Sequence, residues 1–199
     1  MEIKIIPAGI YDANCYVLVD NDTKDCAIID PGGDAEVIIN KIKSLGVKVN
    51  FVLLTHGHAD HTGGVKEIRN EFKCPVYINK KDYEIIRLGE SIFGNMAENG
   101  DAFIKDGEEL SFGNIKIKCI ETPGHTPGGM CYLIDGKLFT GDTLFYGSVG
   151  RTDFAYGNFD MLQTSIKSKL FTLSEDTLAF PGHGPKTSIG FEKENNPFV

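Results

Sequence analysis

The segment Thr55-His56-Gly57-His58-Ala59-Asp60-His61 places three imidazoles and one carboxylate within a few residues. It follows the apolar run Phe51-Val52-Leu53-Leu54, which predicts a buried strand, and precedes Thr62-Gly63-Gly64, where we expect a helix to begin. Burying so many polar side chains is costly unless they share a partner. The small residues Gly57 and Ala59 let a loop wind so that these side chains converge. Histidine combined with aspartate favours zinc, iron or manganese over calcium or magnesium, so the segment predicts a metal site.

A solvated polar loop with chance histidines is the alternative, and the remaining histidines argue against it. His125 follows a predicted strand at 115–121, and His183 follows another at 177–180. Asp142 stands in the same way after a predicted strand, on a glycine-rich turn. Functional sites gather at such strand-end loops. Because all five histidines of the chain fall there, we predict one centre that holds one or two metal ions in an enzyme.

Apolar runs separated by Gly, Pro, Asn and Asp predict a β-rich chain with several helices. Strands are expected at residues 2–6, 14–19, 26–30, 49–54, 75–78, 115–121, 130–134, 137–141 and 177–180. Helices are expected at residues 34–45, 62–72, 80–88 and 159–171, and a mobile flap at 90–101. The length of 199 residues favours one domain over residues 1–199.

Two hairpins in the sequence resemble each other. Residues 15–18 lead through a turn to a strand that ends at Asp30, and residues 131–134 lead to a strand that ends near Asp142. The similarity of these two segments suggests two similar β-rich halves, each covered by helices. The alternative is that hairpins commonly look like this.

Composition excludes several partners and compartments. The formal net charge is −8 without a cluster of Lys or Arg, which argues against a nucleic-acid partner and favours a small-molecule substrate. No apolar run is long enough to span a bilayer, and the first residues lack the features of a signal peptide. The five cysteines contain no C-x-x-C, which predicts reduced, buried thiols in a cytoplasmic protein.

Taken together, these motifs resemble the metallo-β-lactamase superfamily, and within it the short, single-domain bacterial proteins that are similar to glyoxalase II (hydroxyacylglutathione hydrolase). The resemblance covers nearly the whole chain. The motifs occur in the family's order: Asp30-Pro31-Gly32, His56 to His61, the segment at His125, Gly141-Asp142-Thr143 and the segment at His183. The resemblance implies an α/β fold, a four-layer αββα sandwich with metals at one edge between the two sheets.

The resemblance also implies two groups of three metal ligands and one bridging residue. The first group is His56, His58 and His125, the second is Asp60, His61 and His183, and Asp142 is the bridge. The implied cofactors are two divalent ions, with zinc preferred and iron or manganese as alternatives. Asp30 would support the ligands by hydrogen bonds, or would only form the turn before Pro31-Gly32.

Within the superfamily, the ligands discriminate among reactions. One major β-lactamase class has Cys at the position of Asp142, and the flavin-linked di-iron reductases usually have Glu at the position of His58. The nuclease branches add nucleic-acid-binding segments. The leading hypothesis is therefore a thioesterase resembling hydroxyacylglutathione hydrolase. In it the metals lower the pKa of a water to give hydroxide, which attacks a thioester carbonyl, and Asp60 and Asp142 act by holding those metals.

A persulfide dioxygenase is the alternative from another reaction class. Such enzymes resemble this chain across the same motifs, including Gly150-Arg151-Thr152-Asp153-Phe154. They use one iron, held by residues that match His56, His125 and Asp142, with open positions for oxygen and substrate. A third possibility, a metal-binding protein without catalysis, predicts a missing ligand, and no ligand is missing.

The C-terminal part of the sequence bears on which thiol carries the acyl group of the substrate. Glyoxalase II enzymes add a helical C-terminal region with basic residues for glutathione, whereas this sequence stops soon after His183. Arg151 is a candidate for binding a substrate carboxylate, or else it braces Asp153. Phe145 and Tyr146 are candidates for the pocket wall.

Overall fold

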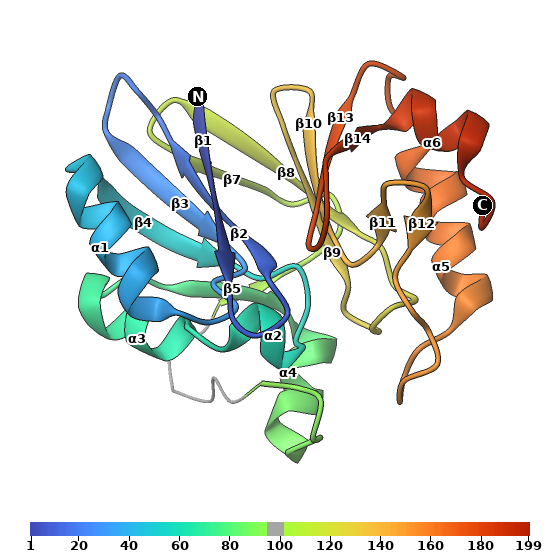
Figure 1. Cartoon of the computed structure of the whole chain (residues 1–199), viewed down its shortest axis with the longest axis horizontal. Coiled ribbons are helices and arrows are strands. Elements are labelled where there is room, and N and C mark those ends of the chain that lie inside the picture. The colour runs from blue at the N-terminus through green and yellow to red at the C-terminus, as the bar shows by residue number, and fades with distance from the viewer. Residues whose placement is uncertain (95–101) are drawn as a thin grey trace.

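Two six-stranded β-sheets face each other in the computed structural model, which describes residues 1–94 and 102–199 (Figure 1). In order, the first sheet contains β1 (Glu2–Ala8), β2 (Ala13–Val19), β3 (Asp25–Ile29), β4 (Lys48–Leu53), β5 (Val76–Asn79) and β6 (Ala102–Ile104). The second contains β14 (Thr187–Ser188), β13 (Leu178–Pro181), β10 (Lys137–Gly141), β9 (Met130–Ile134), β8 (Ile115–Glu121) and β7 (Glu109–Phe112). Residues 95–101 of the predicted flap lie outside the described residues.

Helices cover the outer faces of both sheets, so the layers follow the order αββα, as predicted (Figure 1). The first sheet is covered by α1 (Ala35–Leu45), α3 (Val65–Phe72) and α4 (Lys80–Leu88). The second is covered by α5 (Phe159–Ser165), the π-helical turn η1 (Ile166–Leu170) and α6 (Ile189–Asn195). None of the described helices has the length and apolar character that crossing a membrane requires.

The alternation of side chains along each strand builds three apolar layers. In β2, Val17 faces the helices of the first sheet, whereas Leu18 faces the second sheet. Aromatic rings fill the space between the sheets, where Phe139 stacks on Phe180 with ring centroids 5.2 Å apart. All five cysteines are buried and free, as expected.

The two halves of the chain repeat one topology. In the first half, β1, β2 and β3 pair antiparallel, and β3 then pairs with β4 in parallel. In the second half, β8, β9 and β10 pair antiparallel, and β10 pairs with β13 in parallel. A helix connects the parallel strands in each half, which supports the two similar halves that the hairpins suggested.

The sequence did not predict several short strands and one short helix, and one predicted helix is divided in the structure. The predicted helix at 62–72 is two helices, α2 (Ala59–Thr62) and α3, separated by Gly63 and Gly64. A Cβ at Gly63 would lie 2.5 Å from the carbonyl oxygen of Gly32, so these glycines let the chain pass close to the Asp30-Pro31-Gly32 turn. The missed strands are β6, β7, β14 and the hairpin of β11 (Leu144–Phe145) and β12 (Ser148–Val149), all too short to show a period. The missed helix α6 carries Gly190 in its first turn.

The aromatic layer between the sheets predicts a large cost for truncation. Phe139→Ala removes a ring that is 0% exposed, and we expect the free energy of unfolding to fall by about 3–5 kcal/mol. Val37→Ala on the exposed face of α1 is the control, expected within about 0.5 kcal/mol of the parent chain. Chemical denaturation measures both, and equal effects would contradict the layered core.

Candidate metal centre

Five strand ends bring the predicted ligands and Asp30 together. In the first half, Asp30 follows β3 and His56 follows β4, and these strands are parallel neighbours. In the second half, Asp142 follows β10 and His183 follows β13, again parallel neighbours, while His125 follows β8. Parallel strands end at the same edge of a sheet, so these residues meet where the edges of the two sheets face each other.

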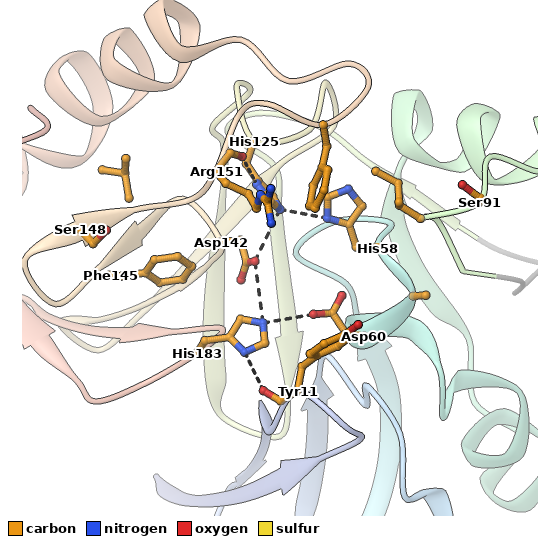
Figure 2. A pocket seen from close by; sticks show the side chains of 14 residues that line it. Tyr11, His58, Asp60, Ser91, His125, Asp142, Phe145, Ser148, Arg151 and His183 are labelled. Atoms are coloured by element: carbon orange, nitrogen blue, oxygen red, sulfur yellow. Dashed lines mark hydrogen bonds and ion pairs between the residues drawn. The ribbon is translucent and has the colours of Figure 1, made fainter.

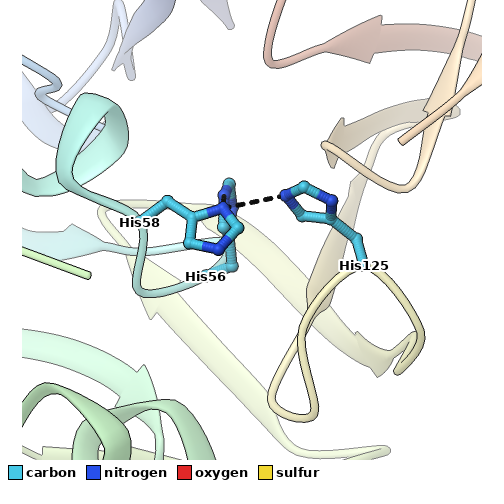
Figure 3. A group of neighbouring side chains, drawn as sticks. All are labelled: His56, His58 and His125. Atoms are coloured by element: carbon cyan, nitrogen blue, oxygen red, sulfur yellow. Dashed lines mark hydrogen bonds between the residues drawn. The ribbon is translucent and has the colours of Figure 1, made fainter. Parts of the chain in front are cut away.

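The first predicted group is assembled in the structure. His56, His58 and His125 offer ring nitrogens that all lie within 4.8 Å of one another (Figure 3). The Nδ1 atom of His58 lies 3.1 Å from His56 Nε2 and 3.0 Å from His125 Nε2. Two of these histidines come from the loop after β4, and the third comes from the other half of the chain.

Hydrogen bonds among these three rings cannot satisfy them. The Nδ1–H of His125 donates to the carbonyl oxygen of Arg151 at 2.7 Å, which leaves a lone pair on Nε2. The hydroxyl of Thr55 donates to Asp30 at 2.6 Å and accepts from His56 Nδ1 at 3.0 Å, which leaves a lone pair on His56 Nε2 as well. His58 Nδ1 can donate to only one of these two nitrogens. At least one close pair therefore repels unless a cation lies between them.

The second predicted group is also assembled. Asp60, His61 and His183 offer ligand atoms within 4.8 Å of one another. His61 Nε2 lies 3.2 Å from His183 Nε2, and Asp60 Oδ2 lies 3.2 Å from the same nitrogen of His183. His183 Nδ1 donates to the carbonyl oxygen of Tyr11 at 3.2 Å, which turns Nε2 toward the group (Figure 2).

Asp142 touches one histidine of the first group and both histidines of the second. Its Oδ1 lies 3.3 Å from His61, and its Oδ2 lies 3.5 Å from His125 and 3.9 Å from His183. In Figure 2 its carboxylate lies between His125 and His183. This position fits the bridging role that the family resemblance implied.

Asp30 supports both groups, and it also forms the turn. Its backbone is left-handed, with φ 51°, as expected for a residue that forms the turn before Pro31-Gly32. Its carboxylate accepts from the backbone N–H of Thr55 at 2.8 Å and from the hydroxyl of the same residue. It also lies 3.0 Å from His61 Nδ1. One buried carboxylate thus orients His61 directly and His56 through Thr55.

The ionisable side chains of the centre shift one another's pKa values. Burial, reinforced by the neighbouring histidines, lowers the pKa of His56 well below its usual range and that of His58 to about 3, so both rings are neutral. Burial also opposes the charge on His61, but Asp142 and Asp30 overcome it and raise the pKa of His61 well above its usual value. In the same way His61 and His125 lower the pKa of Asp142 against its burial.

These residues fit divalent metal ions. Neutral imidazoles and ionised carboxylates are the ligand forms that zinc, iron and manganese require. Within the described chain, the buried Oδ1 of Asp142 makes no well-formed hydrogen bond and lies 3.3 Å from His61 Nε2, which suits an oxygen that shares a cation with that imidazole. The first group would offer three nitrogens to one ion and the second would offer two nitrogens and a carboxylate to another, and Asp142 lies between the two groups.

A cavity of about 710 Å³ opens over the centre (Figure 2). Phe145 lines it, as predicted, with its ring 6.3 Å from that of His183. Arg151 lines it too, but its guanidinium holds both oxygens of Asp153, at 2.8 and 2.7 Å, and lies over the ring of Phe154. The structure therefore shows Arg151 bracing Asp153 while it also faces the cavity.

The prediction for Tyr146 is wrong. This residue sits in the two-residue turn between β11 and β12 and does not line the cavity. Its ring stacks instead on Phe191 of α6, with centroids 4.8 Å apart. The cavity-facing positions of this hairpin are Phe145, Ser148 and Val149.

Several functional positions were not predicted from the sequence. Tyr11, Ser91 and Phe154 line the cavity, and Asp82 holds two of the ligand loops from helix α4. No local pattern marks them, because they act on residues that are distant in the chain. Only the aromatic character of Phe154, beside Arg151, offered a signal.

Paired groups of histidine and aspartate that could hold metal ions, at the edge of an αββα sandwich, are typical of a metallo-hydrolase. A family model of the metallo-β-lactamase superfamily matches residues 8–183. The chain belongs to this superfamily, whose members bind divalent metals.

Individual relatives cover the whole length of the chain. Hydroxyacylglutathione hydrolase GloC from Haemophilus influenzae is 40% identical, over 100% of this chain and 98% of its own. The crystal structure of the BLEG-1 B3 metallo-β-lactamase is 38% identical, with a TM-score of 0.91 over 99% of each chain. ETHE1 from Myxococcus xanthus, known from a crystal structure, is 29% identical in sequence. Its structure matches with a TM-score of 0.86 and covers 99% of this chain and 84% of its own.

The contacts of Asp30 generate a prediction that separates metal support from turn formation. Asp30→Asn keeps a residue that tolerates a left-handed backbone but replaces one accepting oxygen with an N–H donor. We expect metal affinity to fall about 10- to 100-fold, as measured by competition with a chelator. Asp135→Asn is the matched control, because Asp135 is also left-handed, with φ 47°, in an exposed turn. An unchanged metal affinity in Asp30→Asn would show that Asp30 forms the turn and does not support metal binding.

Proposed function

We propose that the chain is a metal-dependent thioesterase whose reaction resembles that of hydroxyacylglutathione hydrolases. The observation that carries the proposal is the position of Asp142 between two complete groups of three ligands. The likeness to GloC over the full length of both chains supports the choice of a thioester. The cofactors would be two divalent ions, zinc in the first instance, with iron and manganese as alternatives.

The chain's own residues prepare the site for this chemistry. Bound metals would supply Lewis acidity, which lowers the pKa of a water and polarises the substrate carbonyl. Asp30 and the carbonyl oxygens of Arg151 and Tyr11 fix His61, His125 and His183, so the ligands need no rearrangement during reaction. A thiolate is a good leaving group, and this reaction needs no strong general acid.

The cavity wall fits a small substrate. Apolar contact is available from Tyr11, Ile92, Phe145, Val149 and Phe154. The hydroxyls of Ser91 and Ser148 offer hydrogen bonds on opposite sides of the cavity (Figure 2). With a net charge of −8, we propose a small-molecule thioester as partner rather than a nucleic acid or a membrane.

A persulfide dioxygenase is the second candidate, favoured by the likeness to ETHE1. His125 and Asp142 approach to 3.5 Å, and the ring of His56 lies 4.8 Å from that of His125. Two histidines and one carboxylate would suffice to hold a single iron. This candidate leaves the group Asp60, His61 and His183 without a metal role.

Metal content and substrate preference together decide between the candidates. Protein purified without oxygen and without added metal is expected to contain about two ions per chain and to hydrolyse small thioesters. Thiol release from a set of acyl groups and carriers, glutathione among them, measures the preference, and a β-lactam serves as comparison because of the likeness to BLEG-1. A single iron per chain with oxygen-dependent persulfide oxidation would overturn the thioesterase proposal.

Arg151 generates a kinetic prediction. Arg151→Ala removes the guanidinium over Phe154 but keeps the carbonyl oxygen that holds His125. An ion pair between Arg151 and a substrate carboxylate at this exposed site would contribute about 0.5–1 kcal/mol, so we expect KM to rise about two- to fivefold with kcat and metal content unchanged. Lys186→Ala changes an exposed cation that does not line the cavity and is the control. A lower Tm with unchanged KM would show that Arg151 only braces Asp153.

A further inference from the structure

Asp82 is a buried carboxylate that the proposed chemistry does not use. It lies in the first turn of α4 and is 0% exposed. Burial raises the pKa of its carboxyl, against the hydrogen bonds that it accepts. A buried carboxylate is costly unless its oxygens are well satisfied, so its partners indicate what it does.

All three partners of Asp82 belong to the loops that carry the three-histidine group. Its Oδ2 accepts from the backbone N–H of Gly57 at 2.8 Å and from the hydroxyl of Thr126 at 2.7 Å. Its Oδ1 accepts from the backbone N–H of Gly128 at 2.6 Å. Gly57 stands between His56 and His58, and Thr126 directly follows His125.

We propose that Asp82 is a positioning residue that clamps the loop of His56 and His58 to the loop of His125. The inference rests on the metal centre of the proposed function but not on its substrate. His58 Nδ1 lies 3.0 Å from His125 Nε2 and can donate to only one of His56 and His125, so the rings alone do not hold both loops together before a cation binds. The carboxylate of Asp82 supplies that attachment through two backbone N–H groups and one hydroxyl, none of which belongs to the three rings.

The contacts around Gly57 and Gly128 show that the clamp requires close approach. A Cβ on Gly128 would lie 2.6 Å from Asp82 Oδ1, and a Cβ on Gly57 would lie 2.8 Å from the ring of Phe93. Glycine at position 128 therefore allows its N–H to reach the carboxylate, and glycine at position 57 allows the loop to pass close to Phe93. Larger residues at either position would separate the loop from α4 or from the segment that follows it.

The segment that follows α4 holds the same loop from the other side. The N–H of Ala59 donates to the carbonyl oxygen of Ile92, and the N–H of Gly94 donates to that of Gly57, both at 3.0 Å. The ring of Phe93 packs edge-on against His58, with centroids 4.8 Å apart. Helix α4 and residues 89–94 thus form one support for His58, and Ser91 and Ile92 of that support also line the cavity.

Asp82→Asn tests the clamp, because it keeps the size of the side chain and turns one acceptor into a donor that faces N–H or O–H groups. The affinity of the apoprotein for zinc is measured by competition with a chelator. His183→Ala serves as a second background, because it disrupts the second group and isolates zinc binding at the three histidines. We expect Asp82→Asn to weaken this binding about 10- to 100-fold in both backgrounds.

Two further variants keep the test decisive. Glu192→Gln is the matched control, since Glu192 is another 0% exposed carboxylate that accepts a backbone N–H, that of Gly147, which belongs to the β11–β12 hairpin and not to the loops of His56, His58 and His125. It is expected to lower Tm while zinc affinity stays at the parent value. If Asp82→Asn fails to fold, Thr126→Val removes one of the three hydrogen bonds and is expected to weaken zinc binding in the same direction.

If Asp82→Asn folds, keeps the zinc affinity of the parent chain and has a lower Tm, the clamp proposal is overturned. Asp82 would then have a purely structural role. Parental affinity in Thr126→Val would do the same if the Asn variant does not fold. Failure of the parent chain to bind zinc, iron or manganese would instead overturn the metal centre itself. Metal binding without thioester hydrolysis would overturn the proposed reaction and leave the clamp testable by the same titration.

Discussion

The close approach of imidazole nitrogens that hydrogen bonds cannot all satisfy is the constraint on which the rest of the structure depends. His58 Nδ1 lies about 3 Å from nitrogens of His56 and His125, and the outer hydrogen bonds of these two rings turn their lone pairs inward. Such an arrangement is unfavourable until a cation fills it. The protein must therefore hold the ligands in place with groups other than the ligands, and two buried aspartates, Asp30 and Asp82, do this.

The fold provides the rigidity that this arrangement demands. Each half of the chain ends a pair of parallel strands at the same edge, and the ligands follow directly from those ends. The strands themselves are fixed by three apolar layers, so the loops begin from fixed points. Glycine at position 128 then lets its N–H reach the clamping carboxylate of Asp82, which a side chain there would block, and glycine at position 57 makes room for the ring of Phe93.

The sequence was sufficient for the layers and the ligands because both leave local signals. Strands of five or more residues show a period, and His56, His125 and Asp142 stand on loops that follow such strands. Tyr146 was misplaced because the register of the short hairpin β11–β12 decides which residues face the cavity, and two-residue strands carry no periodic signal. Asp82 was missed because its role depends on a helix meeting two loops that are 25 and 44 residues away in the chain.

The division of the ligands between the halves has a consequence for stability. Each three-ligand group takes two residues from the first half, around His58 and Asp60, and one from the second half, His125 or His183. A metal ion in either group therefore connects the two halves across the space between the sheets. Because the unfolded chain does not hold these residues together, metal binding stabilises the folded state by mass action. A metal ion bound there would be held by the layered fold and would in turn join its two halves, so the centre would be part of the architecture as well as the site of the proposed chemistry.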